Sequence, residues 1–203
     1  MSLHDAFAPY FGPVPPLLAL AGVAGLGTVA LTYLRAHAGF HVIRRVPPRE
    51  RLLPPAVATL LVLPVVAVDL LGGFPRELNV PLPTALVFYP SIGVVAETVF
   101  HVVPLALLIA VLRRPLRGLG TERTIWVCIV LASSLEPTFQ VMMARGSSPV
   151  WATTYVGLHL TVFNLLALSL FRRVDFLAAY LFRLAYYLSW HIVWGAVRLD
   201  LLF

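Results

Sequence analysis

The sequence predicts an all-α integral membrane protein, a bundle of about six helices that each cross the bilayer. Of its 203 residues, 60% are hydrophobic and only 12% are charged. Soluble domains are typically about half apolar and about a quarter charged, so this composition is typical of a membrane protein. Six apolar runs are also long enough to cross, since a transmembrane helix needs about 20 mostly apolar residues. We expect residues 1–203 to form one membrane domain.

The six predicted spans follow one another with short connections. They are Pro16–Leu34, Leu53–Leu71, Thr84–Leu112, Thr124–Met143, Val150–Phe171 and Phe176–Val197. The third span is longer than a crossing requires, so it is expected to tilt or bend. Pro90 and Pro104 are the candidate kinks in it, because proline has no backbone N–H to donate.

The arginines predict how the bundle is oriented. Clusters occur in the first, third and fifth connections: Arg35, Arg44, Arg45, Arg49, Arg51, Arg113, Arg114, Arg117, Arg123, Arg172 and Arg173. The second and fourth connections contain only Arg76 and Arg145. Positive residues mark the cytoplasmic side, so both termini are expected outside, as in a multi-pass protein of a bacterial inner membrane.

The charge and the single cysteine exclude several classes of protein. The net charge of +6 comes from short arginine clusters between apolar runs, an arrangement that fits anionic lipid headgroups and indicates no nucleic-acid partner. Residues 1–11 contain Asp5 and no basic stretch, so no cleavable signal peptide is predicted. Cys128 alone can form neither an internal disulfide nor a multi-cysteine metal site.

Polar side chains inside the apolar runs are the candidate site residues, because an ionisable group at bilayer depth is costly unless it is paired. Glu97 and His101 are four residues apart and therefore share one face of the third helix. Glu136 and Gln140 repeat this spacing on the fourth helix. A carboxyl group in mid-membrane is a candidate proton acceptor.

The fifth and sixth helices add further polar groups. His159 and Asn164 lie in the fifth run, and Arg183, Tyr187 and His191 follow at successive fours in the sixth. Counted from the outer ends, Glu136, His159 and His191 lie roughly 10–15 Å deep and Glu97 roughly 20 Å. We therefore expect four helices to bring carboxylates and imidazoles into one layer.

Other polar and aromatic residues have simpler interpretations. Asp69 is near a helix end and is expected to reach the outer interface. Arg183 is expected to pair with Glu136 or Asp69. An aromatic belt and packing stripe is predicted for the last helix, from Tyr186, Tyr187, Trp190 and Trp194.

Four segments carry a resemblance to a known family. Ala96–His101 is similar to a Glu-Glu-x-x-x-Arg motif, keeping the second glutamate and Phe100, with His101 at the arginine position. Ser133–Gln140 is similar to a Phe-x-x-x-His motif, with Gln140 at the histidine. His191–Gly195 aligns with a His-x-x-x-Asn/Asp motif, with Gly195 at the last position. The segment from Phe163 and Asn164 to Arg173 resembles an Asn-containing helix and basic turn.

Together these segments resemble the CAAX-protease and bacteriocin-processing family of intramembrane proteases, the type II CAAX prenyl endopeptidase-like proteins, over roughly residues 84–203. The resemblance implies that Glu97 is the general base that activates a water molecule. It implies that His191 is a polarising group or a ligand. His101 and His159 would replace the missing imidazole, and Glu136 the missing carboxylate. The implied substrate is a membrane-anchored, prenylated or propeptide chain. The implied site comprises Glu97, His101 and His191, supported by Glu136, Gln140, His159 and Asn164.

Three altered motif positions, at Ala96, His101 and Gln140, leave other functions open. One is a catalytically lapsed relative that acts as a membrane scaffold or partner-binding subunit. Another is a metal or haem site built from histidines and glutamates, with zinc, another divalent ion or no cofactor at all. Ion or proton transport also follows from buried carboxylates and histidines, although no internal repeat typical of transporters is present.

Overall fold

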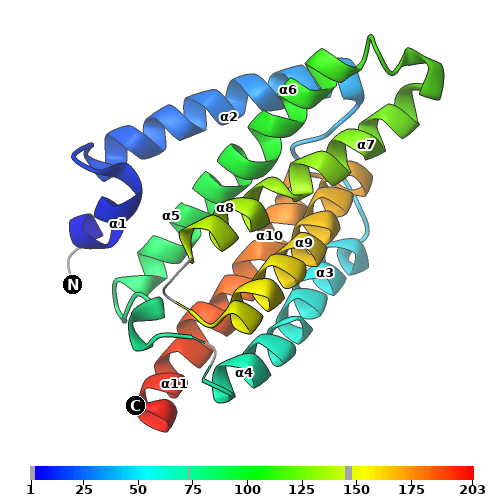
Figure 1. Cartoon of the computed structure of the whole chain (residues 1–203). Coiled ribbons are helices and arrows are strands. Elements are labelled where there is room, and N and C mark those ends of the chain that lie inside the picture. The colour runs from blue at the N-terminus through cyan, green and yellow to red at the C-terminus, as the bar shows by residue number, and fades with distance from the viewer. Residues whose placement is uncertain (1–2, 73, 145–147) are drawn as a thin grey trace.

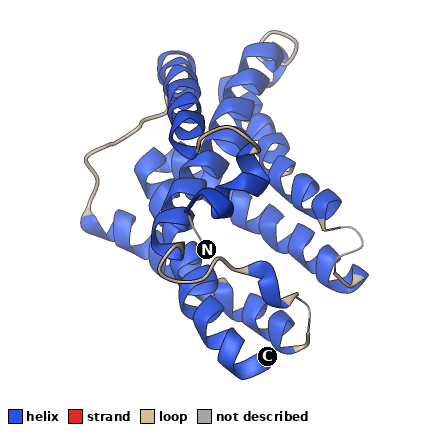
Figure 2. Cartoon of the chain, turned by 90° about the vertical axis from the view of Figure 1, so that its left-hand side faces the viewer, coloured by secondary structure: helices blue, strands red, loops and turns tan. Residues whose placement is uncertain are grey.

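The fold is a helical bundle, described by a computed structural model over residues 3–72, 74–144 and 148–203 (Figure 1). These ranges contain helices and connecting loops and no strand (Figure 2). Six helical stretches are long and apolar enough to cross a membrane. The predicted fold class is therefore confirmed. Arg145 lies outside the described residues.

The spans are built from twelve labelled elements, two of them π-helical. They are α2 (Pro16–Ala38); α3 (Pro48–Leu60) with α4 (Val62–Leu70); α5 (Ala85–Ala96), η2 (Glu97–Val102) and α6 (Val103–Leu112); α7 (Thr121–Ser133) with α8 (Leu135–Met143); α9 (Val150–Arg173); and α10 (Phe176–Tyr187), η4 (Leu188–Trp194) and α11 (Gly195–Leu202). A short helix, α1 (Leu3–Phe11), precedes them, and two 3₁₀ turns, η1 (Arg76–Leu78) and η3 (Arg117–Leu119), lie in connections.

Several spans extend past their predicted ends, because a helix continues into polar sequence until a residue stops it. The α3 helix begins at Pro48, five residues before the apolar run, since proline suits the first helical turn. The α2 helix continues to Ala38 and ends at Gly39, whose φ of 68° places it in the left-handed region that favours glycine.

Proline shapes the third and fourth spans in different ways. Before Pro104 the third span widens into the π-helical turn η2, the kind of local change that accompanies interruptions of helical hydrogen bonding. The fourth span breaks at Ser134, between α7 and α8. Pro137 cannot donate to the carbonyl of Ser133, four residues earlier, so that carbonyl is free for another donor.

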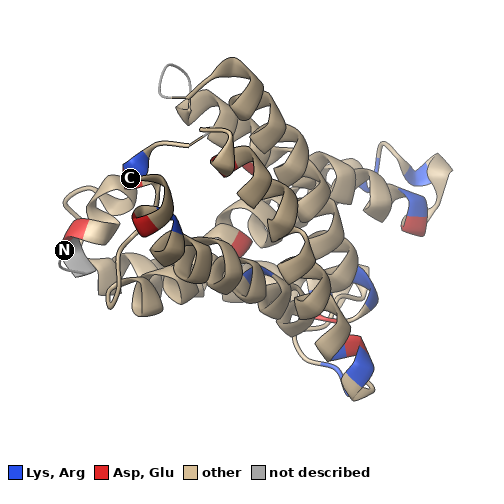
Figure 3. Ribbon diagram, turned by 90° about the horizontal axis from the view of Figure 1, so that it is seen from below, with Lys and Arg blue, Asp and Glu red and all other residues tan. Residues whose placement is uncertain are grey.

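The arginine-bearing connections lie at one end of the bundle. The α2–α3, α6–α7 and α9–α10 connections gather at the end opposite both termini in Figure 1. Most of the Lys and Arg positions, coloured blue, lie at that end in Figure 3. The alternation along the chain is therefore also a separation in space. That this end faces the cytoplasm stays a prediction from the positive-inside rule.

Three apolar clusters hold the helices together, and the smallest of them lies between α1 and α5. The first joins α2, α6, α7 and α9 through buried residues such as Leu34, Ile109, Ile129 and Phe171. The second joins α3, α4, α9, α10 and η4. Tyr186 and Trp190 are buried in the second cluster, so these two predicted aromatic residues serve as packing groups and not as an interfacial belt.

Asp69 does not reach the outer interface as predicted; its side chain is 1% exposed. Arg198 of α11 donates two hydrogen bonds to its carboxylate, from Nε to Oδ2 at 2.7 Å and from Nη2 to Oδ1 at 2.8 Å. Trp194 donates its indole N–H to the same carboxylate at 2.7 Å. Because α11 continues five residues beyond the predicted span, it brings a buried cation to a carboxylate that otherwise has no counter-charge.

Candidate functional site

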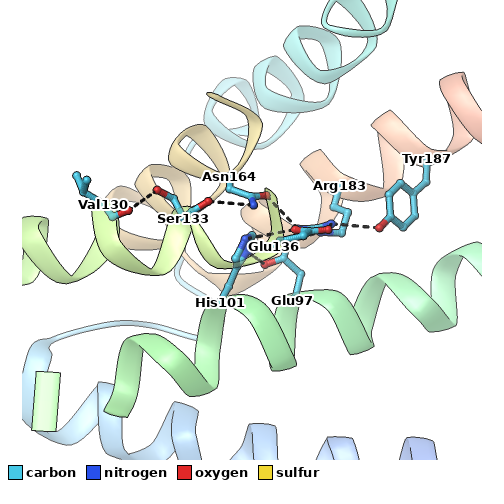
Figure 4. Close-up of polar contacts among 8 residues, drawn as sticks. All are labelled: Glu97, His101, Val130, Ser133, Glu136, Asn164, Arg183 and Tyr187. Atoms are coloured by element: carbon cyan, nitrogen blue, oxygen red, sulfur yellow. Dashed lines mark hydrogen bonds and ion pairs between the residues drawn. The ribbon is translucent and has the colours of Figure 1, made fainter. Parts of the chain in front are cut away.

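Four of the predicted site residues meet inside the bundle around Arg183 (Figure 4). Glu97 and His101 come from η2, Glu136 from α8, and Asn164 from α9. Each of these four residues and Arg183 is at most 3% exposed. We call these five residues the central cluster.

Arg183 is the hub of the central cluster. Its Nε donates to Oε1 of Glu97 at 2.6 Å, and Nη1 and Nη2 donate to the two oxygens of Glu136 at 3.0 and 2.9 Å. Nη1 also donates to the Tyr187 hydroxyl at 3.1 Å, and Nη2 to Oδ1 of Asn164 at 3.5 Å. A guanidinium has five N–H groups in a fixed fork, and here all five have acceptors.

His101 supplies a second contact to Glu97. Its Nδ1 lies 2.8 Å from Oε2 of Glu97 and carries the hydrogen if the carboxylate is ionised, since an ionised carboxylate can only accept. Its Nε2 lies 3.7 Å from Oε2 of Glu136 and has no hydrogen-bond partner. One guanidinium balances the charge of only one of the two carboxylates.

The local sequence explains why Asn164 belongs to the central cluster. Its Nδ2 donates to the carbonyl of Ser133 at 3.3 Å, the carbonyl that Pro137 leaves without a helical donor. This contact fixes the amide so that Oδ1 faces Arg183. Asn164 therefore ties α9 to the break between α7 and α8 and orients one acceptor toward the guanidinium.

Two cavities border the central cluster. The larger, of about 640 Å³, is lined by α1, α5, η2, α8 and η4 and includes aromatic walls such as Tyr89 and Phe139. The smaller, of about 150 Å³, is lined by Arg183 and the α9 residues Tyr155 and His159. Both touch one polar set of side chains: Glu136, Gln140, Tyr187 and His191. Glu97 and His101 line neither of these two cavities.

The other three predicted site residues lie apart from the central cluster. The His191 ring hydrogen-bonds through Nδ1 to Oδ1 of Asn79 at 2.9 Å and stacks on Tyr89 at 4.5 Å between centroids. His191 is eight residues after Arg183, a rise of roughly 12 Å along the helix. Its hydrogen-bond partner is Asn79 and not a member of the central cluster, so the gathering of His191 with Glu97 in one layer stays a prediction.

His159 and Gln140 line the smaller cavity without entering the central cluster. His159 lies between two tyrosine hydroxyls, that of Tyr155 at 3.3 Å and that of Tyr186 at 3.1 Å. Gln140 is exposed. The spacing of Glu136 and Gln140 therefore places them on one helix face, but only Glu136 is drawn to the cation.

Arg183 is the residue whose central place sequence reasoning underestimated. It was expected to pair with Glu136 or Asp69; it pairs with Glu136 and with Glu97. The available signal was a lone arginine in an apolar run of a chain that also places two glutamates in apolar runs. Within the described ranges, no group of three or more His, Cys, Asp and Glu side chains is arranged to hold a metal ion.

No protein-family model, no curated protein and no solved structure matches this chain. What the molecule is therefore follows from its own sequence and geometry: a polytopic helical membrane protein with a buried Glu–Arg–Glu–His cluster beside a cavity.

Proposed function

We propose that this chain is a catalytically lapsed relative of the CAAX-protease family that binds a segment of a membrane-anchored partner in the larger cavity. The observation that carries this proposal is the position of Arg183 between Glu97 and Glu136. The proposal keeps the family resemblance for the helices and assigns binding, not cleavage, to the site.

Ion pairing removes the freedom that a general base needs. A general base must lie within hydrogen-bond reach of the proton it abstracts. Glu97 gives one oxygen to Arg183 and the other to His101, and it lines neither cavity. Glu136 faces the cavities, but both of its oxygens accept from Arg183.

The larger cavity has the chemistry to hold a peptide segment in the membrane. Most of its wall is aliphatic or aromatic, and one side carries the polar set Glu136, Gln140, Tyr187 and His191. Backbone N–H and C=O groups have no partners in hydrocarbon. A polar patch in an apolar cavity offers such partners to a non-helical segment while the walls contact its apolar side chains.

Thiol protection tests binding. In a Cys128→Ala background, Val99→Cys places a thiol in the cavity wall, and Leu107→Cys places one on the outer surface of the same span. A synthetic lipid-anchored peptide should slow maleimide labelling at position 99 several-fold and leave position 107 unchanged. Equal labelling rates with and without peptide at position 99 would contradict the proposal.

Hydrolysis of a membrane-anchored peptide is the second candidate, favoured by one specific observation. Glu136 lines both cavities. Nε2 of His101, which has no hydrogen-bond partner among the described residues, lies 3.7 Å from Oε2 of Glu136. If Arg183 released Glu136, a carboxylate and an imidazole would face the cavity together.

Cleavage assays separate the two candidates. Purified protein in detergent is incubated with a membrane-anchored fluorogenic peptide, beside Glu97→Gln, Glu136→Gln and His191→Ala variants. The binding proposal expects the unsubstituted protein to match the Glu97→Gln/Glu136→Gln double variant, which serves as the blank. Cleavage that Glu136→Gln abolishes would instead establish hydrolysis.

A further inference from the structure

A second polar hollow lies at the arginine-rich end of the bundle, away from the central cluster. Its volume is about 150 Å³, and its wall comes from the end of α2, the end of α6 and the start of α7. Three basic side chains line it: His37, Arg113 and Arg117. No carboxylate is among its lining residues.

The two arginines of this hollow have no counter-charge in the described part of the chain. The described ion pairs at this end are Arg51 with Asp175 and Arg172 with Glu122. Arg113 and Arg117 make no ion pair and no side-chain hydrogen bond with the described residues, and both are exposed. Two adjacent cations with no partner repel each other, so an anion between them is favourable.

The backbone that carries the arginines is held in place. Arg113 follows the last turn of α6, and its N–H donates to the carbonyl of Ile109. Arg117 belongs to a tight loop that the buried Thr124 clamps: its hydroxyl lies 3.2 Å from the carbonyl of Leu116 and 3.0 Å from that of Gly120. The backbone positions of both arginines are therefore fixed by hydrogen bonds within the protein.

His37 closes the third side of the hollow. Its Nδ1 donates to the carbonyl of Tyr33 at 3.1 Å, and its ring stacks on Tyr33 with centroids 4.4 Å apart. The ring is thereby held beside the two arginines.

We propose that this hollow binds a phosphate group through Arg113 and Arg117. Arginine forks match phosphate oxygens in pairs, and charge-assisted bonds of this kind are among the strongest hydrogen bonds in proteins. The hollow lies at the end of six predicted membrane spans, where the headgroups of anionic phospholipids lie. The phosphate of such a lipid and free inorganic phosphate share this chemistry, and the experiment distinguishes them.

Lipid retention and thermal stabilisation test the proposal on the whole chain. Protein in a neutral detergent is titrated with phosphatidylglycerol, with phosphatidylcholine and with inorganic phosphate, and bound lipids are counted by native mass spectrometry. Stabilisation by phosphatidylglycerol alone would identify a lipid headgroup as the source. Stabilisation by inorganic phosphate as well would identify a phosphate site that also accepts free anions.

Two charge-matched double variants assign the effect to the hollow. Replacing Arg113 and Arg117 with Gln should weaken binding by about tenfold or more, since hydrogen bonds to charged groups contribute more than neutral ones. Replacing Arg114 and Arg123 with Gln removes the same charge from exposed residues outside the hollow and should leave binding nearly unchanged. Equal losses in both variants, or no stabilisation by either phosphate source, would overturn the proposal. Unchanged unfolding temperatures without ligand would show that both variants are folded.

Discussion

Arg183 and Arg198 sit in two buried arginine clusters that look alike and differ in one respect. Both guanidiniums are at most 1% exposed, and both grip a carboxylate with two parallel bonds. In both, all five N–H groups have acceptors. Burying a cation in a membrane bundle is costly, and at both places the chain meets that cost with complete hydrogen bonding.

The difference lies in the remaining acceptors. Those of Arg198 are backbone carbonyls of the connection before α5, at Phe74, Pro75 and Arg76. Those of Arg183 are side chains: a second carboxylate from η2, an amide from α9 and a tyrosine hydroxyl from α10 itself. The Asp69–Arg198 cluster is therefore a neutral clamp that fastens a connection to α11. The central cluster carries one carboxylate more than its guanidinium balances.

A structural clamp does not need this second carboxylate. Replacing a buried ion pair with apolar residues is often neutral or stabilising, so such pairs are weak evidence for a stabilising role. A second carboxylate, an imidazole whose Nε2 has no hydrogen-bond partner among the described residues and an adjoining cavity together distinguish the central cluster from the Asp69–Arg198 clamp. Substitutions in each cluster test whether the two differ in this way.

Arg183→Met should have the largest effect. It leaves Glu97 and Glu136 buried with no guanidinium, and breaking a buried pair by removing one partner costs about 3–5 kcal/mol. The unfolding free energy in mixed detergent micelles measures the loss. A triple variant that adds Glu97→Gln and Glu136→Gln should recover much of the stability, because the stranded charges are removed. No recovery would show that the loss came from packing.

Arg198→Met should cost less, about 3 kcal/mol, because one carboxylate is stranded and Trp194 still donates to it. The same unfolding measurement applies, and Asp69→Asn added to Arg198→Met is the matched rescue. If Arg198→Met proved more destabilising than Arg183→Met, the two clusters would not differ in the way that their acceptors indicate.

His101→Leu should rank third, at about 2 kcal/mol, since it removes a hydrogen bond to a charged group. The Asp69–Arg198 cluster has no counterpart to this residue. Combining His101→Leu with Glu97→Gln should be less destabilising than the sum of the two single changes, because the two side chains are in contact. Strict additivity in this double-mutant cycle would contradict the coupling of His101 and Glu97.

Glu122→Gln should have the smallest effect, about 0.5 kcal/mol or less. Glu122 pairs with Arg172 at the arginine-rich end, and its side chain is 58% exposed. If Glu122→Gln lowered the free energy of unfolding as much as His101→Leu does, the exposure of an ion pair would not predict its contribution to stability. The comparison between buried and exposed arginines would then fail.

The sequence alone was enough for the number of spans, their order and the clustering of arginines in alternate connections. These features depend on length and composition, since any 20-residue apolar helix satisfies its own backbone in a bilayer. The contact of Glu97 with His101 also followed, because a separation of four residues fixes a shared helix face without reference to other helices.

The tertiary structure alone decided which polar groups meet. Residues on one face of a helix are spread along its axis, and which of them faces a neighbouring helix depends on tilt, packing and local breaks. Arg183 therefore joins Glu97 and Glu136 while His191, on the same helix, turns to Asn79. Asp69 pairs with Arg198, which is more than a hundred residues later in the sequence. No local sequence pattern predicts this pairing.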